Sequence, residues 1–172
     1  METKSNFIDF YLKHPIWLDS LLVIVLFFTN YFVPKVFTIK YGIDTQLNIL
    51  SSLIGTSVSL AGFILAALTI IVAFKSNIAS KIAQEASNPL ELLFSTSNYS
   101  KVVKVFKDAI IELTVVFIGL YVIWVMLENF SSSTLLNSNI YGALLIFLAV
   151  LRTLFVLFLV LDLDGADGDP DE

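Results

Sequence analysis

The sequence contains no cysteine and a single histidine, His14. Without cysteine there is no disulfide, no thiolate nucleophile and no cysteine-based metal site. One histidine excludes a multi-histidine metal site or proton relay within one chain. The chain also lacks a phosphate-binding loop, a dinucleotide fingerprint and a zinc-protease motif. We therefore expect a protein that is not an enzyme and that holds no metal or other cofactor.

Charge is also scarce. Charged residues make up 15% of the chain and hydrophobic residues 57%, whereas an ordinary soluble domain has about a quarter charged residues. The mean hydropathy is +0.86. No dense basic patch is present, so we expect no nucleic-acid partner. The apolar residues gather in long runs, which is typical of a protein whose partner is the lipid bilayer.

Four of these runs have the length of a membrane-crossing helix, about 20 residues. They are residues 16–33, 47–74, 109–127 and 141–161. Backbone groups in lipid must bond within their own segment, so the runs are predicted to be helices. We expect an all-α polytopic membrane protein with four transmembrane helices in one domain, residues 1–162. The acidic end of the chain, residues 163–172, is predicted to be a disordered tail.

The distribution of lysines predicts the orientation. The N-terminal segment and the loop between the second and third spans together contain seven lysines, the first loop contains two and the third loop none. Because basic loops stay in the cytoplasm, both termini are predicted to be cytoplasmic. The first span is not followed by a small-residue cleavage site, so we expect a retained, multi-pass protein of the bacterial inner membrane.

The cytoplasmic loop, residues 75–108, is predicted to be largely helical. A break is expected at Asn88-Pro89, and a new helix near Ser97 or Asn98 that continues into the third span. The start of this helix has an apolar face opposed to a row of lysines: Lys101, Lys104 and Lys107. Such a row suits contact with anionic headgroups or with a cytoplasmic protein partner.

The second span contains a regular series of small residues. We use the name small-residue face for Ser52, Gly55, Thr56, Ser59, Gly62, Ala66, Thr69 and Ala73. Apart from Thr56, which flanks the series, they follow each other at alternating intervals of three and four, a period of 3.5. Small residues let membrane helices approach closely. Three interpretations remain open: a contact inside the four-helix bundle, an oligomer axis or a pore lined by hydroxyls, and a cavity for a lipid or small solute.

Arg152 lies inside the fourth span, where an arginine costs about 2.5–3.5 kcal/mol to insert. Its candidate charge partners are Asp19 and Glu112. We expect these carboxylates to lie near the cytoplasmic interface, within reach of water or Lys75. Hydroxyls and carbonyls of the second span, near Thr56 and Ser59, are then better placed to accept hydrogen bonds from Arg152. Arg152 is interpreted as a tie between two helices, with gating or anion passage and a lipid-facing side chain as alternatives.

The second span, the segment "LLFSTSNYSKVVKVFKDAI" and the third span together resemble small multi-span membrane proteins of phage-defence systems, such as the four-span subunit of Kiwa. The resemblance covers about residues 50–125. It implies a non-enzymatic homo-oligomer of the inner membrane that senses or perturbs the membrane, together with a cytoplasmic partner at residues 75–108. Two alternatives stay open: an ion or solute channel or transporter that uses the hydroxyl band and Arg152, and a membrane anchor for another subunit.

Overall fold

The structure is a computed structural model that describes residues 15–32, 41–78 and 98–165. Every regular element in these three segments is a helix, so the predicted all-α class is confirmed. The elements are α2 (Pro15–Phe32), α3 (Ile43–Ile78), α5 (Asn98–Val125), the short 3₁₀ turn η2 (Leu127–Asn129) and α6 (Ser132–Gly165).

Three helices are long and apolar enough to cross a membrane: Ile43–Ala73 in α3, Tyr99–Val125 in α5 and Ser132–Phe158 in α6. They cover most of three of the four predicted spans, 47–74, 109–127 and 141–161. The first predicted span corresponds to α2, whose stretch Pro15–Leu26 is also apolar. The long helices bear out the prediction of a membrane protein.

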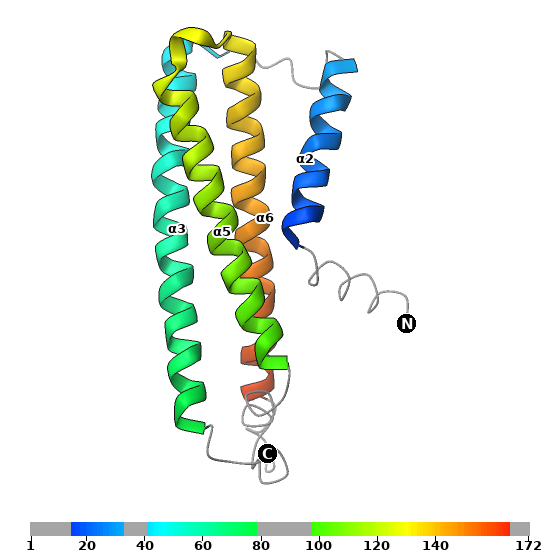
Figure 1. Ribbon diagram of the computed structural model, residues 1–172, viewed down its shortest axis with the longest axis vertical. Helices are drawn as coiled ribbons and strands as arrows, with labels where there is room; N and C mark the ends of the chain where they lie inside the picture. The colour runs from blue at the N-terminus through cyan, green and yellow to red at the C-terminus, as the bar shows by residue number, and fades with distance from the viewer. Residues whose placement is uncertain (1–14, 33–40, 79–97, 166–172) are drawn as a thin grey trace.

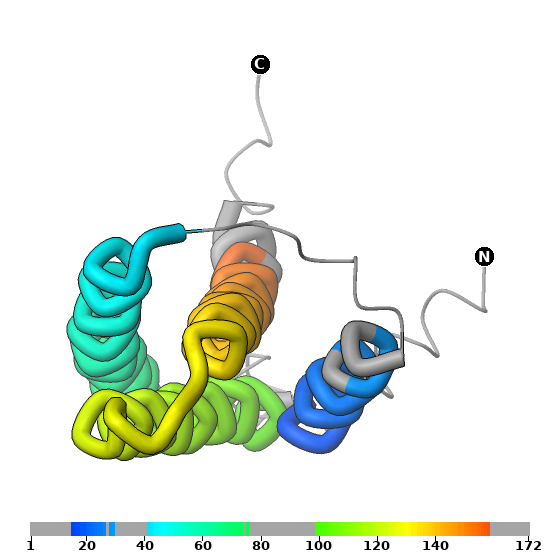
Figure 2. Tube along the Cα trace, turned by 90° about the horizontal axis from the view of Figure 1, so that it is seen from above, coloured from blue at the N-terminus to red at the C-terminus, as the bar shows by residue number. Residues whose placement is uncertain are grey.

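α3, α5 and α6 form an antiparallel bundle, in which α5 packs against both of the other helices (Figure 1). α2 packs less extensively against α5 and α6. The view along the bundle shows α2 on the side of α5 and α6 that is remote from α3 (Figure 2). α2 also begins part-way along the bundle and runs beside its upper part (Figure 1).

The interior of the three-helix bundle is built from heptad-spaced residues. In the described part of α6, all buried positions except Arg152 follow each other at alternating intervals of four and three: 135, 139, 142, 146, 149, 153 and 156. A period of 3.5 keeps one stripe of a helix facing its neighbours over many turns. The apolar members of the core are Leu50, Ile64, Ile71, Val102, Val105, Phe106, Ala109, Leu113, Val116, Leu120, Leu135, Ile146, Ala149 and Val156.

The closest approach of α5 and α6 occurs at Gly142. A Cβ atom at this position would lie 3.0 and 3.1 Å from the two Cδ atoms of Leu120. Because Gly142 has no side chain, the Leu120 side chain of α5 packs directly against the backbone of α6. In contrast, a Cβ at Gly55, Gly62 or Gly119 would meet nothing within 4 Å.

Two helix ends differ from the prediction. α6 begins at Ser132 rather than near residue 141, because the Ser131 hydroxyl accepts a hydrogen bond from the Thr134 backbone N–H at 3.2 Å and caps the helix. α6 also continues through Gly165, into the predicted tail, because extending a formed helix adds a hydrogen bond for each residue that is fixed. The rest of the tail, residues 166–172, lies outside the described residues.

The predicted cytoplasmic loop is described only at its two ends. α3 continues past the predicted end of the second span to Ile78, and α5 begins at Asn98, as expected. α5 then runs without a break into the third span. The break predicted at Asn88-Pro89 falls in residues 79–97, outside the described residues.

Candidate functional site

A buried ion triad joins three helices. Arg152 of α6 donates from Nη1 to Oδ2 of Asp19 in α2 at 2.6 Å and from Nη2 to Oε2 of Glu112 in α5 at 2.8 Å. The side chains of Arg152, Asp19 and Glu112 are 0%, 3% and 6% exposed. Charge-assisted bonds from one guanidinium to two carboxylates are strong and directional, particularly away from water.

The expectation that Arg152 bonds to the hydroxyls of the second span is therefore wrong. The depth of each side chain in the membrane was counted from the ends of the apolar runs. Counted in this way, Glu112 and Arg152 lie at different depths. The helices, however, extend beyond these runs. Glu112 lies 14 positions after Asn98 and Arg152 lies 13 positions before Gly165. The hydrogen bond between them places the two side chains at the same height on antiparallel helices.

The expectation of interfacial carboxylates is also wrong for Asp19 and Glu112, because both are buried. Neither is placed to use Lys75 as its partner. The Lys75 ammonium instead lies 3.9 Å from the centre of the Tyr99 ring and links the end of α3 to the start of α5 through a cation–π contact.

The triad attaches α2 to the bundle. Much of α2 is exposed, including Trp17 at 79% and Leu21 at 56%, whereas Asp19 between them is 2% exposed. A buried ion pair is costly to break because removal of one partner leaves an uncompensated charge. Arg152 thus acts as the predicted tie between helices, with α2 and α5 rather than α3 as its partners.

The small-residue face lies on the outside of the bundle. All of its members are exposed: Ser52, Gly55, Thr56, Ser59, Gly62, Ala66, Thr69 and Ala73. Open space surrounds Gly55 and Gly62. The hydroxyls of Ser52 and Thr69 bond to carbonyls four residues earlier in their own helix. Among the described helices, the face therefore does not form the predicted contact inside the bundle.

α3 has two opposite faces that both repeat every seven residues. The inner face contacts the bundle through Leu50, Ser57, Ile64 and Ile71, all of which are buried. The outer face is the small-residue face. Exposed bulky residues border it, with Val58, Leu65 and Val72 on one side and Phe63 and Ile70 on the other. Because its side chains are smaller than those on both borders, we call the small-residue face the furrow of α3.

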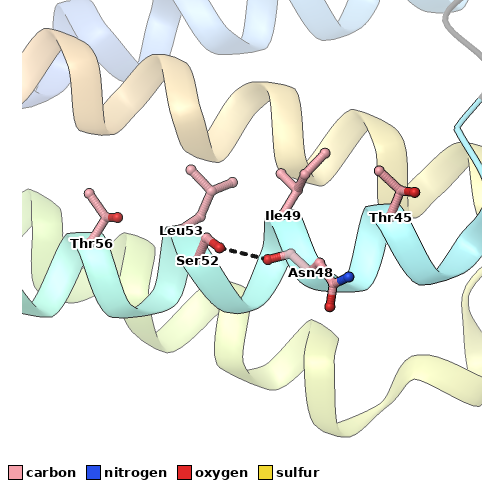
Figure 3. Close-up of a pocket in the computed structure, with 6 residues that line it drawn as sticks. All are labelled: Thr45, Asn48, Ile49, Ser52, Leu53 and Thr56. Carbon is pink, nitrogen blue, oxygen red and sulfur yellow. Dashed lines mark hydrogen bonds between the residues drawn. The ribbon is translucent and has the colours of Figure 1, made fainter.

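The hydroxyl-rich end of this furrow widens into a shallow groove of about 280 Å³. Its lining, Thr45, Asn48, Ile49, Ser52, Leu53 and Thr56, comes from α3 alone (Figure 3). A ligand cavity would enclose its occupant with walls from several elements. The groove lacks such walls, so the shape fits a neighbouring helix better than a small solute. Arg152, held by α2 and α5, takes no part in it.

A second buried polar cluster, which the sequence pattern did not indicate, lies at the opposite end of α3 from Lys75. Gln46 Nε2 donates to the Tyr41 carbonyl and to Ser132 Oγ, both at 3.0 Å. Asn139 Nδ2 donates to the Gln46 carbonyl at 2.9 Å. Gln46 and Asn139 are 2% and 4% exposed. The cluster joins the start of α3 to the start of α6. Both polar residues lie just outside the predicted spans, so neither stands out as a polar residue within an apolar run.

The row Lys101, Lys104 and Lys107 is exposed on α5, opposite the buried Val102, Val105 and Phe106. The predicted opposition of a basic and an apolar face therefore holds in this helix. Lys75 lies at the same end of the bundle, because α3 ends where α5 begins (Figure 1).

No protein-family model matches this chain, and no curated protein or solved structure matches it significantly. The assignment of function therefore depends on the geometry of the buried ion triad and of the outward small-residue face.

Proposed function

We propose that the protein is a non-enzymatic homo-oligomer of the bacterial inner membrane, in which the small-residue faces of α3 from neighbouring copies pack together. The observation that carries this proposal is the outward position of the small-residue face. Side chains of minimal size let two membrane helices come close enough for extensive van der Waals contact and interhelical hydrogen bonds. A face with this spacing that lies outside the packed interior of the described helices is best explained by a second copy.

The proposed topology has four spans, with α2 as the first, and both termini in the cytoplasm. Its support is the gathering of Lys75, Lys101, Lys104 and Lys107 at one end of the bundle. In this arrangement the lysine row contacts anionic headgroups, and residues 75–108 offer a docking segment to a cytoplasmic protein partner.

The absence of cysteine makes the topology simple to test, because any introduced thiol is unique. Ser100 at the start of α5 and Ser133 at the start of α6 are both exposed and lie at opposite ends of the bundle. We expect a membrane-impermeant maleimide to label Ser100→Cys only in inside-out vesicles and Ser133→Cys only in right-side-out vesicles. Labelling of both from the same side would contradict the proposed orientation.

The proposed role is that of a membrane-sensing or membrane-perturbing component of a phage-defence system. The resemblance of residues 50–125 to such proteins suggests the process, and the outward furrow of α3 supplies a surface through which assembly can change the bilayer. A helix that packs against other copies and also touches lipid is well placed to couple assembly to membrane permeability.

This role predicts that phage infection lowers the membrane potential of cells that produce the protein. The measurement is the signal of a potential-sensitive dye, with plaque counts in parallel. Gly62→Leu, which fills the furrow, is expected to preserve the potential, and Gly119→Leu, on the exposed side of α5, is expected to behave like the unmodified protein. An unchanged potential together with plaque counts equal to those of cells lacking the protein would contradict the defence role.

The exposed hydroxyls of Ser52, Thr56 and Ser59 favour one other candidate, a channel along an oligomer axis. In that arrangement the same outward face lines a pore instead of a dry contact. A channel conducts in planar bilayers as the purified protein alone, without infection or partner. Purified oligomer that shows no conductance would remove this candidate and leave the proposed role untouched.

A further inference from the structure

The close approach of α5 and α6 at Gly142 fixes the relative heights of exposed residues on these two antiparallel helices. Leu120 packs against Gly142, so positions equally far from this contact lie at the same height. Leu151 comes nine positions after Gly142, and Ile111 comes nine positions before Leu120. Both side chains are exposed, at 51% and 43%. This pair therefore compares two faces of the bundle at one height.

The exposed apolar surface ends at different heights on these two helices. On α5 it ends at Ile111, and the lysine row follows toward the start of the helix. On α6 it continues at least to Phe158, which is 58% exposed. Phe158 lies sixteen positions after Gly142 and Lys104 sixteen positions before Leu120, so these two side chains share one height. The seven positions from Lys104 to Ile111 correspond to about 10 Å along a helix. The apolar surface of α6 therefore reaches further toward this end of the bundle than that of α5.

α3 has its bulky exposed residues at the same end as α6. The contact of Lys75 with the Tyr99 ring places the end of α3 level with the start of α5. Ile70, which is 57% exposed, comes five positions before Lys75 and therefore lies close to the height of the lysine row. Toward the other end, all exposed residues are small or polar as far as residue 56: Asp44, Thr45, Asn48, Ser51, Ser52, Gly55 and Thr56. The bulky apolar surface of this helix, from Val58 to Val72, is thus displaced toward the lysine end.

α2 has its exposed apolar surface at the height of α5. The bonds of Arg152 to Asp19 and Glu112 place the first turns of α2 level with Glu112. From there α2 runs beside the upper part of the bundle (Figure 1), and its exposed apolar residues extend from Trp17 to Phe28. α2 lies next to α5 and remote from α3 (Figure 2). The belt of exposed apolar residues therefore runs obliquely around the bundle, higher on α2 and α5 than on α3 and α6.

A bundle with an oblique belt matches a bilayer of even thickness by tilting, as single membrane helices do. In the tilted orientation the lysine row leaves the hydrocarbon at one surface, and the groove lined by Thr45, Asn48 and Ser52 leaves it at the other. The lysine ammonium groups then lie among the headgroups, where they attract anionic phosphate. Their aliphatic stems remain in contact with apolar surface.

We propose that the bundle sits obliquely in the bilayer and that the lysine row holds this orientation by binding the phosphate groups of anionic phospholipids. The inference deepens the proposed contact of the lysine row with headgroups. It makes the tilt of the bundle depend on the lipid composition, which is a means of sensing the membrane.

Two spin labels at matched heights test the oblique orientation, because the chain has no cysteine of its own. Ile111→Cys places a label on α5 and Leu151→Cys places one on α6, each in the full chain in vesicles that contain phosphatidylglycerol. Relaxation by oxygen and by a water-soluble nickel complex measures the depth of each label. We expect the label at Leu151 to lie deeper than the label at Ile111, by up to about 10 Å. Equal depths would overturn the oblique orientation.

The role of the headgroups is tested by removing either partner. Lys101→Gln together with Lys107→Gln removes two charges of the row, and vesicles of pure phosphatidylcholine remove the anionic lipid. Either change is expected to lower the depth difference about twofold or more. Glu128→Gln, at an exposed position beyond the other end of α5, is the control and should retain the full difference.

A depth difference that stays the same after either change would overturn the binding of headgroups and leave the lysine row to a cytoplasmic protein. Neither result depends on assembly through α3 or on which end of the bundle is cytoplasmic, so the outcome is separate from that of the proposed function.

Discussion

Replacement of Arg152 with alanine is expected to destabilise the protein by about 3–5 kcal/mol, the typical cost of removing one partner from a buried ion pair. The guanidinium is fully buried and supplies the donors for both Asp19 and Glu112. Without it, at least one carboxyl group loses its countercharge in a region without water. The measurement is unfolding of the purified protein in mixed detergent micelles, followed by the loss of helical circular dichroism.

Two comparisons make this prediction specific. Lys107→Ala removes a positive charge from an exposed position of α5 and is expected to change stability by less than about 0.5 kcal/mol. The triple variant Asp19→Leu, Glu112→Leu, Arg152→Met removes the charges together, and we expect it to recover most of the loss, because a packed apolar site often matches a buried ion pair. An Arg152→Ala variant as stable as Lys107→Ala would show that the triad does not stabilise the bundle.

The three members of the triad were identifiable from the sequence, but their pairing was not. A charged residue in an apolar run is a local signal, so Arg152, Asp19 and Glu112 were selected as a set. Their relative heights depend on where each helix begins and ends. α5 and α6 extend well beyond the apolar runs, through polar residues that helical hydrogen bonding accommodates as readily as apolar ones. Hydropathy therefore predicts which segments cross the membrane. It does not predict which residues of two neighbouring spans lie at the same height.

The second span shows a different limit. A period of 3.5 residues was detected on α3, and the structure has such a period on two opposite faces. The large residues of the inner face, such as Leu50 and Ile64, carry no distinctive signal in a helix that is apolar all round. The small residues stand out, although they face away from the chain. Small size indicates close packing without indicating the partner. The glycine that does pack inside the chain, Gly142, belongs to the heptad series of α6 and was not singled out.

Substitution of leucine for Gly62 is expected to dissociate the oligomer while the fold of each copy is retained. Nothing lies within 4 Å of a Cβ at this position, so the single chain has room for the new side chain. Between two copies the furrow would be filled, and overpacking costs about 1–3 kcal/mol at each site. A symmetric contact contains the substitution twice. The dissociation constant should therefore rise at least about 30-fold. Light scattering of the purified protein over a dilution series measures this change.

The glycines of this chain provide matched controls for the same substitution. Gly119→Leu adds an equal side chain to an exposed position of α5, where the space is also open, and is expected to leave both mass and stability unchanged. Gly142→Leu meets Leu120 at the junction of α5 and α6 and is expected to destabilise each copy. Only a variant that changes the mass without changing the unfolding of the monomer reports on an intersubunit contact. If Gly62→Leu and Gly119→Leu gave the same mass at every dilution, the furrow of α3 would face lipid, and the proposed assembly through this helix would be wrong.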